Sequence, residues 1–546
     1  MDILSIQNAI ENAVKTLCNQ DNVYHKDPKT LRKMAEEFGI KTEFGNYNFV
    51  SSVKNRSADL TVYIGSEKVM QKELNENQKR ILSNIEKTLA DVHEYFKKAP
   101  FVCVKRRMGS NPYFTPICTL FVSVHKKDAV RLAYMVCETL FDLKEGQTGE
   151  VKPNLYLVYI PEWQEKDRQI IVFPEIGITY VLGSDYYGEA KKGFLRMAMW
   201  YAKQNDMLGL HAGAKILKVR DVNGKIKKYG MIIFGLTATG KTTHTCHDHG
   251  LKEKEEGIEI IQDDVVFLRK DGAALGSEKG FYVKTEGLNP KTQPLLYNAI
   301  IKTDSILENV MVDYKGKVDF SDQTLTGNGR GIIQRTSLGK YMGDVNLPSL
   351  SELDGLIFAF ITRRNTVVPI VSKLTSEQAA AFFMLGESVE STGGDPKRAG
   401  ESVREVGTNP FIIGDYAQEG NWIYDFLKIN EGRTQCYLLN TGGVGEIVEK
   451  DEKGNKIVKQ KVLRVEIEEM ANIIKSIVKG DIEWIKEPNF GLLVPKSIKG
   501  VDMKKFDLEK FYTKDQVKTL VNQLKKERVE WLKRFEGLKK EIINAL

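Results

Sequence analysis

The sequence predicts a two-domain α/β protein with a phosphate-binding loop in its C-terminal half. Its 546 residues exceed what a single hydrophobic core usually organises, so two or more domains are expected. Short β-type runs alternate with amphipathic helical segments from Phe101 onward, so strands and helices are both expected. The third observation is the stretch 235–242, GLTATGKT, which matches the pattern GxxxxGK[ST] without a mismatch.

The elements are expected in three blocks along the chain. Residues 1–100 are rich in helical patterns, with one polar break at 46–66. The second block holds four β-type runs and a helix, at 101–107, 115–124, 154–163, 168–183 and 189–206. The third block holds a hairpin at 207–235 that turns at Asn223-Gly224, strands at 259–268, 280–285 and 353–363, and charged amphipathic helices over 506–546. The hairpin opens the nucleotide-binding half, so the predicted domains are 1–211 and 212–546.

Composition and cysteine usage fit a soluble globular protein of the cytoplasm, and the charge would suit anionic small substrates. A net charge of +7 is small for this length and no Lys/Arg block stands out, so a nucleic-acid partner is not expected. No apolar run approaches the roughly 20 residues of a membrane helix, and the first 17 residues read as an amphipathic helix rather than a signal peptide. The six cysteines are scattered without a CxxC pair, which indicates reduced thiols.

The stretch 235–242 lies between a predicted strand and a predicted helix, as a phosphate-binding loop does. Gly235 and Gly240 let the backbone curl so that N–H groups face phosphate oxygens, and the helix N-terminus adds the positive end of its dipole. Lys241 is expected to reach the outer phosphates and the Thr242 hydroxyl to contact Mg²⁺. The predicted nucleotide contacts are Gly235, Leu236, Thr237, Ala238, Thr239, Gly240, Lys241, Thr242 and Thr243.

Two acidic residues follow the loop by about twenty positions. Asp263 and Asp264 stand at the end of an apolar run, EIIQDD. Adjacent residues on a strand point to opposite faces, but at a strand end the chain can turn both toward one site. One of them can hold the nucleotide's Mg²⁺ and the other a second metal.

The residues just after the loop pose a separate question. His244, Cys246, His247 and His249 stand within six positions, and such side chains can bind zinc in principle. A helix that leaves a phosphate loop carries its later turns away from the site, and no second ligand cluster accompanies these residues. A metal role is therefore not expected for them.

Several motifs occur in the order that ATP-type phosphoenolpyruvate carboxykinases show, and the chain resembles that family from about Arg56 to about Ile474. The motifs that carry the resemblance are KNRSAD, RMGSNP, YYGEAKKG, LHAGAK, GLTATGKTT, QDDVV, SEKGFYVKT, TGNGR, VVPIVSKLTSEQA and LLNTGG. The loop also lacks the cysteine of the GTP-type enzymes. The resemblance implies an N-terminal α/β domain and a C-terminal nucleotide-binding domain of mixed sheets, that is, a carboxykinase-like fold.

The resemblance implies a reversible reaction in which oxaloacetate and ATP give phosphoenolpyruvate, CO₂ and ADP, in gluconeogenesis or anaplerosis. Decarboxylation leaves an enolate that must be stabilised and then phosphorylated, and a divalent cation serves both purposes. By the family pattern this metal, usually Mn²⁺ beside the nucleotide's Mg²⁺, is held by Lys192, His211 and Asp264. A lysine ligates only when it is neutral, and Lys191, nearby arginines and the metal would lower its pKa.

The same resemblance assigns the remaining site residues. Arg56, Tyr186 and Arg330 match the positions that hold the dicarboxylate, and the planar fork of arginine suits a carboxylate or a phosphoryl group. Arg330 is also expected at the nucleotide. Lys284 would lie on the γ-phosphate beside Lys241, and Arg464 matches the position used at the nucleotide base and ribose.

The chain departs from the family pattern at several positions. The differing or unmatched residues are Thr237 and Ala238 in the loop, Arg363 and Arg364 near the site, Gly393, Gly394 and Arg398 in the only candidate for the mobile lid, and Gly443 and Met470 at the base pocket. Two alternatives stay open. One is a carboxykinase-fold kinase with another acceptor or donor, such as GTP or ADP/pyrophosphate, and the other is a non-catalytic nucleotide-binding protein. A monomer or a small homo-oligomer is expected in each case.

Overall fold

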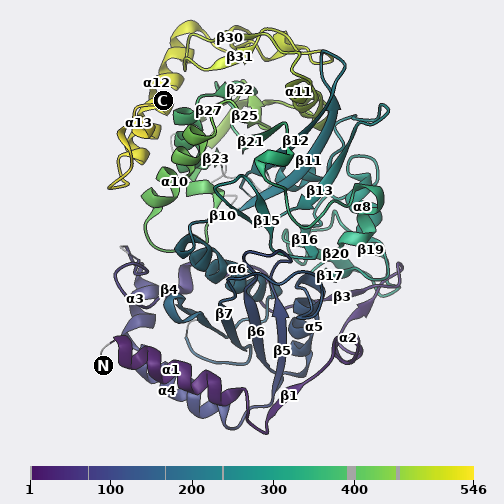
Figure 1. The fold of residues 1–546 in the computed structure, drawn as a ribbon, viewed down its shortest axis with the longest axis vertical. Coiled ribbons are helices and arrows are strands. Elements are labelled where there is room, and N and C mark those ends of the chain that lie inside the picture. The colour runs from purple at the N-terminus through teal and green to yellow at the C-terminus, as the bar shows by residue number, and fades with distance from the viewer. Residues whose placement is uncertain (1–2, 72, 167, 237–238, 390–400, 451–455) are drawn as a thin grey trace. The chain divides into compact units, whose positions relative to one another are not determined.

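The computed structural model describes residues 3–71, 73–166, 168–236, 239–389, 401–450 and 456–546 (Figure 1). The chain divides into two compact units, each discontinuous in sequence. Unit 1 comprises Met1–Gly209, Leu275–Gly339 and Phe411–Asp415, and unit 2 comprises Leu210–Ala274, Lys340–Pro410 and Tyr416–Leu546. Both units contain mixed sheets and helices, so the protein is of the mixed α/β class. The assignment of separate functional domains to 1–211 and 212–546 stays a prediction.

The main sheet of unit 1 has seven strands in the order β1-β5-β6-β7-β9-β8-β4. The strands are β1 Val23–His25, β4 Thr61–Tyr63, β5 Phe101–Arg107, β6 Ile117–Ser123, β7 Asn154–Ile160, β8 Gln169–Phe173 and β9 Ile178–Leu182. The four predicted β-type runs are therefore confirmed as strands. The run 168–183 forms two antiparallel strands because Pro174–Ile176 makes a short helical turn that ends at Gly177 with φ of +67°.

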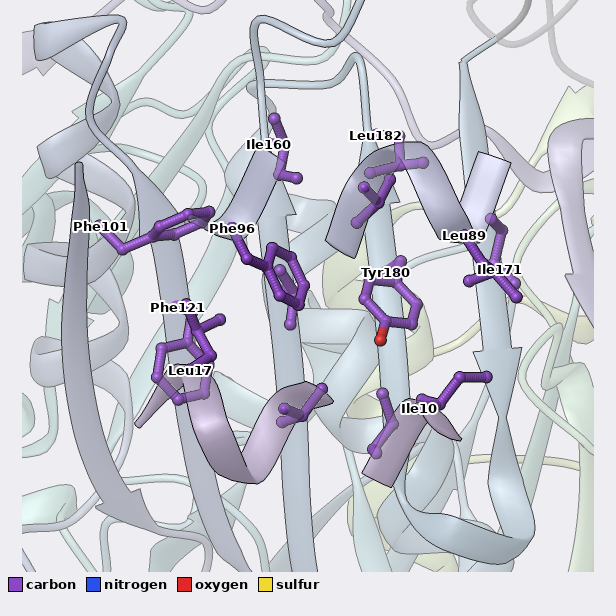
Figure 2. Packing of buried hydrophobic residues seen from close by; sticks show 14 of the residues in the cluster. Ile10, Leu17, Leu89, Phe96, Phe101, Phe121, Ile160, Ile171, Tyr180 and Leu182 are labelled. Atoms are coloured by element: carbon purple, nitrogen blue, oxygen red, sulfur yellow. The ribbon is translucent and has the colours of Figure 1, made fainter. Parts of the chain in front are cut away.

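Helices cover this sheet, and the predicted N-terminal helix is confirmed. The helices of unit 1 are α1 Ile3–Leu17, α2 Pro28–Glu36, α3 Glu76–Ser83, α4 Ile85–Phe96, α5 Val130–Thr139, α6 Tyr187–Gln204 and α8 Pro294–Ile300. Figure 2 shows Ile10 and Leu17 of α1 and Phe96 of α4 packed with Phe121 and Tyr180 of the strands. These side chains are almost fully buried, so α1 and α4 close one face of the sheet.

A second sheet of unit 1 has the order β16-β20-β17-β3-β2. Its strands are β2 Ile40–Lys41, β3 Tyr47–Phe49, β16 Gly280–Lys284, β17 Ile306–Glu308 and β20 Arg330–Gln334. The predicted polar break at 46–66 thus contains the strands β3 and β4, which are only three residues long. β3 pairs in parallel with β17, so residues near 48 and near 307 meet although more than two hundred positions separate them.

The main sheet of unit 2 has eight strands in the order β13-β11-β12-β21-β25-β22-β31-β30. The strands are β11 Ala212–Arg220, β12 Ile226–Phe234, β13 Gly257–Gln262, β21 Gly355–Thr362, β22 Val371–Leu374, β25 Thr434–Asn440, β30 Trp484–Lys486 and β31 Leu493–Pro495. β11 and β12 form the predicted hairpin, with Gly224 at φ of +77° in its turn. β12, β21 and β25 are parallel, so their carboxyl ends lie at one edge of the sheet.

The helices of unit 2 include the predicted C-terminal ones. They are α7 Lys241–Cys246, α9 Ser376–Leu385, α10 Tyr416–Ile429, α11 Ile467–Lys479, α12 Lys514–Leu532 and α13 Lys540–Ile543. The short strands of the chain are β10 Leu208–Leu210, β14 Val266–Leu268, β15 Ala274–Gly276, β18 Met311–Val312, β19 Val318–Asp319, β23 Glu387–Val389, β24 Ser402–Arg404, β26 Gly443–Val444, β27 Ile447–Lys450, β28 Lys456–Gln460 and β29 Leu463–Arg464. Among the described helices, none combines the length and the apolar character that crossing a membrane requires.

Candidate active site

The GxxxxGK[ST] stretch connects the end of β12 to the start of α7. Strand β12 ends at Phe234 and α7 begins at Lys241, so the predicted order of strand, loop and helix is present. Gly240 has φ of +101°, a conformation that favours glycine. A Cβ atom on Gly235 would lie 2.5 Å from Thr239 Oγ1, so a larger residue here would displace the Thr239 side chain. The predicted contacts Thr237 and Ala238 lie outside the described residues.

Helix α7 is shorter than the sequence suggests. It ends at Cys246, and His247 has an extended backbone with φ of −84° and ψ of 138°. His244 and His247 therefore do not stand one turn apart on a continuous helix. The reason is visible in the turn that follows, where His249 adopts φ of +51° and its backbone N–H donates to His247 Nδ1.

The two acidic residues take different partners at the end of β13. The predicted strand at 259–268 is interrupted after Gln262, and the bend presents both carboxylates to the loop region. Thr242 Oγ1 donates to Asp263 Oδ2 at 3.1 Å. Asp264 Oδ1 lies 3.1 Å from His211 Nε2 and 3.5 Å from Lys241 Nζ. Unit 2 thus brings together two predicted ligands of the catalytic metal and two predicted contacts of the nucleotide.

The His211 ring has a fixed orientation. Its Nδ1 lies 2.6 Å from the carbonyl oxygen of Thr408, and because a carbonyl only accepts, Nδ1 carries the proton. In the neutral ring Nε2 then holds the lone pair that a metal uses, beside a carboxylate oxygen. The carboxylate oxygen suits Mg²⁺ or Mn²⁺, and the imidazole nitrogen is a common ligand of transition metals. Among the described residues, no group of three or more His, Cys, Asp and Glu side chains is placed to hold a metal ion.

Thr408 was not predicted, yet it contacts both parts of this arrangement. Its hydroxyl accepts from the backbone N–H of Gly235 at 3.2 Å, while its carbonyl accepts from His211. It is also a β-branched residue with φ of +51°, an uncommon and strained backbone conformation. Backbone strain of this kind concentrates at functional sites. A backbone angle leaves no signal in the sequence, so the sequence alone does not identify Thr408.

In unit 1, the side chains of the predicted residues Arg56 and Lys192 contact the same aromatic ring. The guanidinium of Arg56 lies 4.5 Å and the Lys192 ammonium 4.6 Å from the centroid of Phe411, which was not predicted. An aromatic face attracts cations, so the ring holds both side chains in place. Burial lowers the pKa of Arg56. Lys191, in contrast, forms a buried ion pair with Glu278 at 2.7 Å, so its charge is compensated there.

Tyr186 and Arg330 are joined by Asn328, another residue that was not singled out. Asn328 Nδ2 donates to Tyr186 Oη at 3.1 Å, and Arg330 Nε donates to Asn328 Oδ1 at 3.0 Å. Nδ2 also donates to the Lys54 carbonyl at 2.8 Å. The asparagine thereby fixes the distance between two predicted substrate residues. The sequence did contain a signal for Asn328, because this residue lies within the TGNGR motif.

The other predicted residues lie on strands. Lys284 is the register partner of Arg330 in the β16–β20 pair and forms an ion pair with Glu286. Arg464 is exposed on β29, opposite Gly443. A side chain at Gly443 would collide with the Leu463 carbonyl, so this position requires glycine.

Arg363 and Arg364 differ in their surroundings. Arg364 is buried and donates to Glu387 Oε2 at 2.9 Å and to Ser402 Oγ at 2.8 Å, so its charge is used inside the fold. Arg363 is half-buried, and burial together with the charge of Arg464 lowers its pKa. The lid candidates Gly393, Gly394 and Arg398 lie outside the described residues.

Comparison with known proteins defines the class to which this site belongs. A family model described as phosphoenolpyruvate carboxykinase matches residues 21–504. A phosphoenolpyruvate carboxykinase (ATP) of Aeropyrum pernix is 30% identical over 533 residues, which cover 96% of this chain and 98% of the relative. Proteins of the same name from Bacillus cytotoxicus and Alkaliphilus oremlandii are 27% and 26% identical, over 69% and 74% of this chain and 66% and 73% of their own lengths.

These matches place the chain among the carboxykinases, which are enzymes. Within that class, the chain belongs to the ATP-type phosphoenolpyruvate carboxykinase family. The resemblance drawn from the motifs is thereby confirmed.

Proposed function

We propose that the protein converts oxaloacetate and ATP reversibly into phosphoenolpyruvate, CO₂ and ADP. The observation that carries the proposal is the group formed by His211, Asp264 and Lys241 at the end of the loop, within 3.5 Å of one carboxylate oxygen. A loop that binds phosphate has no need of a histidine beside its lysine and acidic residue. A phosphoryl transfer to an enolate does, because the metal that stabilises the enolate must lie near the γ-phosphate.

The residues of unit 2 are assigned to the nucleotide and the metals. Residues 235–243 hold the phosphates of ATP, with Lys241 on the outer ones. Thr242 and Asp263 serve the nucleotide's Mg²⁺, in agreement with their hydrogen bond of 3.1 Å. His211 and Asp264, with Lys192 as the third ligand, hold Mn²⁺ or a second Mg²⁺. When bound, that cation stabilises negative charge on the enolate oxygen and polarises the phosphoryl group. Arg464 is assigned to the base and ribose.

The residues of unit 1 are assigned to the dicarboxylate. Arg56, Tyr186 and Arg330 bind and orient oxaloacetate, and the Asn328 bridge supports this grouping because it fixes Tyr186 relative to Arg330. The Arg56 guanidinium pairs with a carboxylate, since its half-buried charge gains from a counter-ion. Lys284 and Arg330 also compensate charge on the transferring phosphoryl group. The exclusion of water then protects the enolate from protonation to pyruvate.

The wider setting completes the proposal. Residues 1–211 form the substrate-binding domain and residues 212–546 the phosphate-loop domain. The enzyme works in the cytoplasm as a monomer or a small homo-oligomer, with small-molecule substrates and without a nucleic-acid partner.

Two single variants test the site. In an assay that follows phosphoenolpyruvate formed from oxaloacetate and ATP, Lys241→Ala and His211→Ala are each expected to lower kcat by at least about 100-fold, the scale of removing one group that stabilises transition-state charge. Binding of MgATP, measured separately, is expected to weaken in Lys241→Ala and to persist in His211→Ala. If Lys241→Ala loses activity and His211→Ala keeps it, the metal assignment is wrong. If ATP is hydrolysed while no metal or nucleotide yields phosphoenolpyruvate, a kinase for another acceptor replaces the proposal.

A further inference from the structure

Lys215 lies on β11 with its side chain fully buried, at 0% exposure, and its ammonium group faces the end of α7. Nζ donates to the carbonyl oxygens of His244 at 2.5 Å and His247 at 3.2 Å, and it also contacts His249 Nε2. An ammonium group has three hydrogens, and the two carbonyls together with Nε2, in the tautomer that carries its proton on Nδ1, can accept all of them. The histidines that follow the loop therefore surround a lysine.

The position of this ammonium group suits a helix end. The last carbonyls of a helix lack partners within it, and the helix dipole favours a positive charge there. α7 has six residues, too few to be stable without tertiary contacts. Lys215 supplies such a contact from the neighbouring strand. Because α7 begins at Lys241, whatever holds α7 also fixes the end of the phosphate-binding loop.

The backbone around this contact allows β11 and α7 to approach each other closely. Gly213 lies two positions before Lys215, on the same face of β11, and a Cβ atom there would collide with Thr245 of α7. β11 itself begins directly after His211. Beyond α7, His249 adopts the left-handed backbone conformation in the turn from which its ring reaches Lys215. Such a conformation is unfavourable for a residue with a side chain, so the surrounding contacts must stabilise it.

We propose that Lys215 is a positioning residue for the phosphate-binding loop. The buried ammonium group of Lys215 fixes α7 against β11, the strand that follows His211. The inference rests on the proposed role of the loop in binding ATP. Lys215 touches no substrate in this role. It acts through α7, so its removal weakens ATP binding while the binding of oxaloacetate stays the same.

The charge of Lys215 gives the contact a pH dependence. Burial lowers the pKa of this lysine to about 7, against the opposing effects of Cys246 and Asp248. Burial, followed by the charge of Lys215, keeps the pKa of His249 well below its usual value, so its ring stays neutral and accepts. Above pH 7 the lysine loses one of its three donors and the contact weakens. The titratable groups that face it are His244, Cys246, His247, Asp248 and His249, with Glu468 of α11 next to His247.

Calorimetric titration of the full-length protein with MgATP tests the inference. Lys215→Met is expected to raise Kd by about tenfold or more, the scale of losing hydrogen bonds to a charged group. Lys215→Arg keeps the charge but places a larger, planar group in a fully buried site, so it is expected to recover only part of the affinity that Lys215→Met loses. Lys218→Met is the matched control, because Lys218 lies on the same strand but is 41% exposed and pairs with Glu259. From pH 6.5 to 8.5 the Kd of the wild type is expected to rise and that of Lys215→Arg to stay constant.

The outcomes separate this inference from the proposed function. A folded Lys215→Met protein with the Kd of the wild type overturns the inference. If that variant does not fold, His249→Asn removes one of the three acceptors and is expected to raise Kd about threefold; an unchanged Kd overturns the inference equally. A wild type that binds MgATP but forms no phosphoenolpyruvate contradicts the proposed function alone. A wild type that binds no MgATP contradicts both.

Discussion

Asn328 shows at the scale of one residue how a side chain outside the predicted set can control the site. It donates to Tyr186 and to the Lys54 carbonyl and accepts from Arg330. An asparagine amide offers two donor hydrogens and one acceptor oxygen, so all of its polar groups are used. Aspartate could not replace it, because a carboxylate has no hydrogen to donate to the Lys54 carbonyl.

We expect Asn328→Ala to raise the KM for oxaloacetate about tenfold, because Arg330 and Tyr186 lose the bond that orients them. The affinity for MgATP is expected to stay within about twofold. The measurement is steady-state kinetics with each substrate varied in turn. Asn289→Ala is the control, since Asn289 is a half-buried loop residue whose side chain forms hydrogen bonds within its own turn. Equal KM values for Asn328→Ala and the control would remove Asn328 from the substrate site.

At the scale of elements, the buried carboxylate of Glu387 connects β23, β24, the residues after β21 and α12. Arg364 and Arg528 donate to it, and Arg404 lies 3.8 Å away. Burial raises the pKa of Glu387, but Arg364, Arg528 and Arg404 outweigh burial and leave the pKa well below its usual range. The folded state therefore gains stability above the unfolded pKa of about 4.3 and loses this gain as the pH falls below it.

Glu387→Gln is expected to lower the free energy of unfolding of unit 2 by about 3–5 kcal/mol, because three guanidinium groups lose their counter-charge in a buried site. Urea unfolding at pH 7, monitored by far-ultraviolet circular dichroism, measures this loss in the free energy of unfolding. Glu483→Gln is the control, since Glu483 and its partner Lys496 are 66% and 60% exposed. Such exposed pairs contribute about 0–1 kcal/mol. Similar losses in the two variants would show that the arginines around Glu387 do not depend on its charge.

The elements also show where prediction from the sequence succeeds and where it ends. The hairpin β11–β12 was predictable because Asn223-Gly224 is a strong turn signal between two β-type runs. The end of α7 at Cys246 was not, because the three residues between Cys246 and Gly250 carry no helix-breaking signal. There the contacts of Lys215 and the backbone of His249 decide the conformation, and both depend on tertiary structure.

At the scale of the whole molecule, the motifs predicted the family, and matches over most of the chain confirm it. The discontinuous units could not be predicted, because residues 275–339 join unit 1 through the pairing of β17 with β3. Such long-range pairing leaves no mark in local patterns. For the same reason the sequence does not identify Phe411, Thr408 and Lys215 as functional residues. Each acts through a residue far away in the sequence, whereas Lys241 and His211 stand inside motifs.

One measurement tests the central claim directly: the formation of phosphoenolpyruvate and CO₂ by the wild-type protein from oxaloacetate, with Mg²⁺ and Mn²⁺ present and with ATP, GTP or pyrophosphate as the donor. The account predicts that ATP supports the reaction and that one CO₂ appears for each phosphoenolpyruvate. Omission of the divalent cations is expected to abolish both products. Activity with GTP or pyrophosphate in place of ATP would contradict the assigned donor. The absence of phosphoenolpyruvate with every donor and metal, from a protein that still binds MgATP, would contradict the account itself.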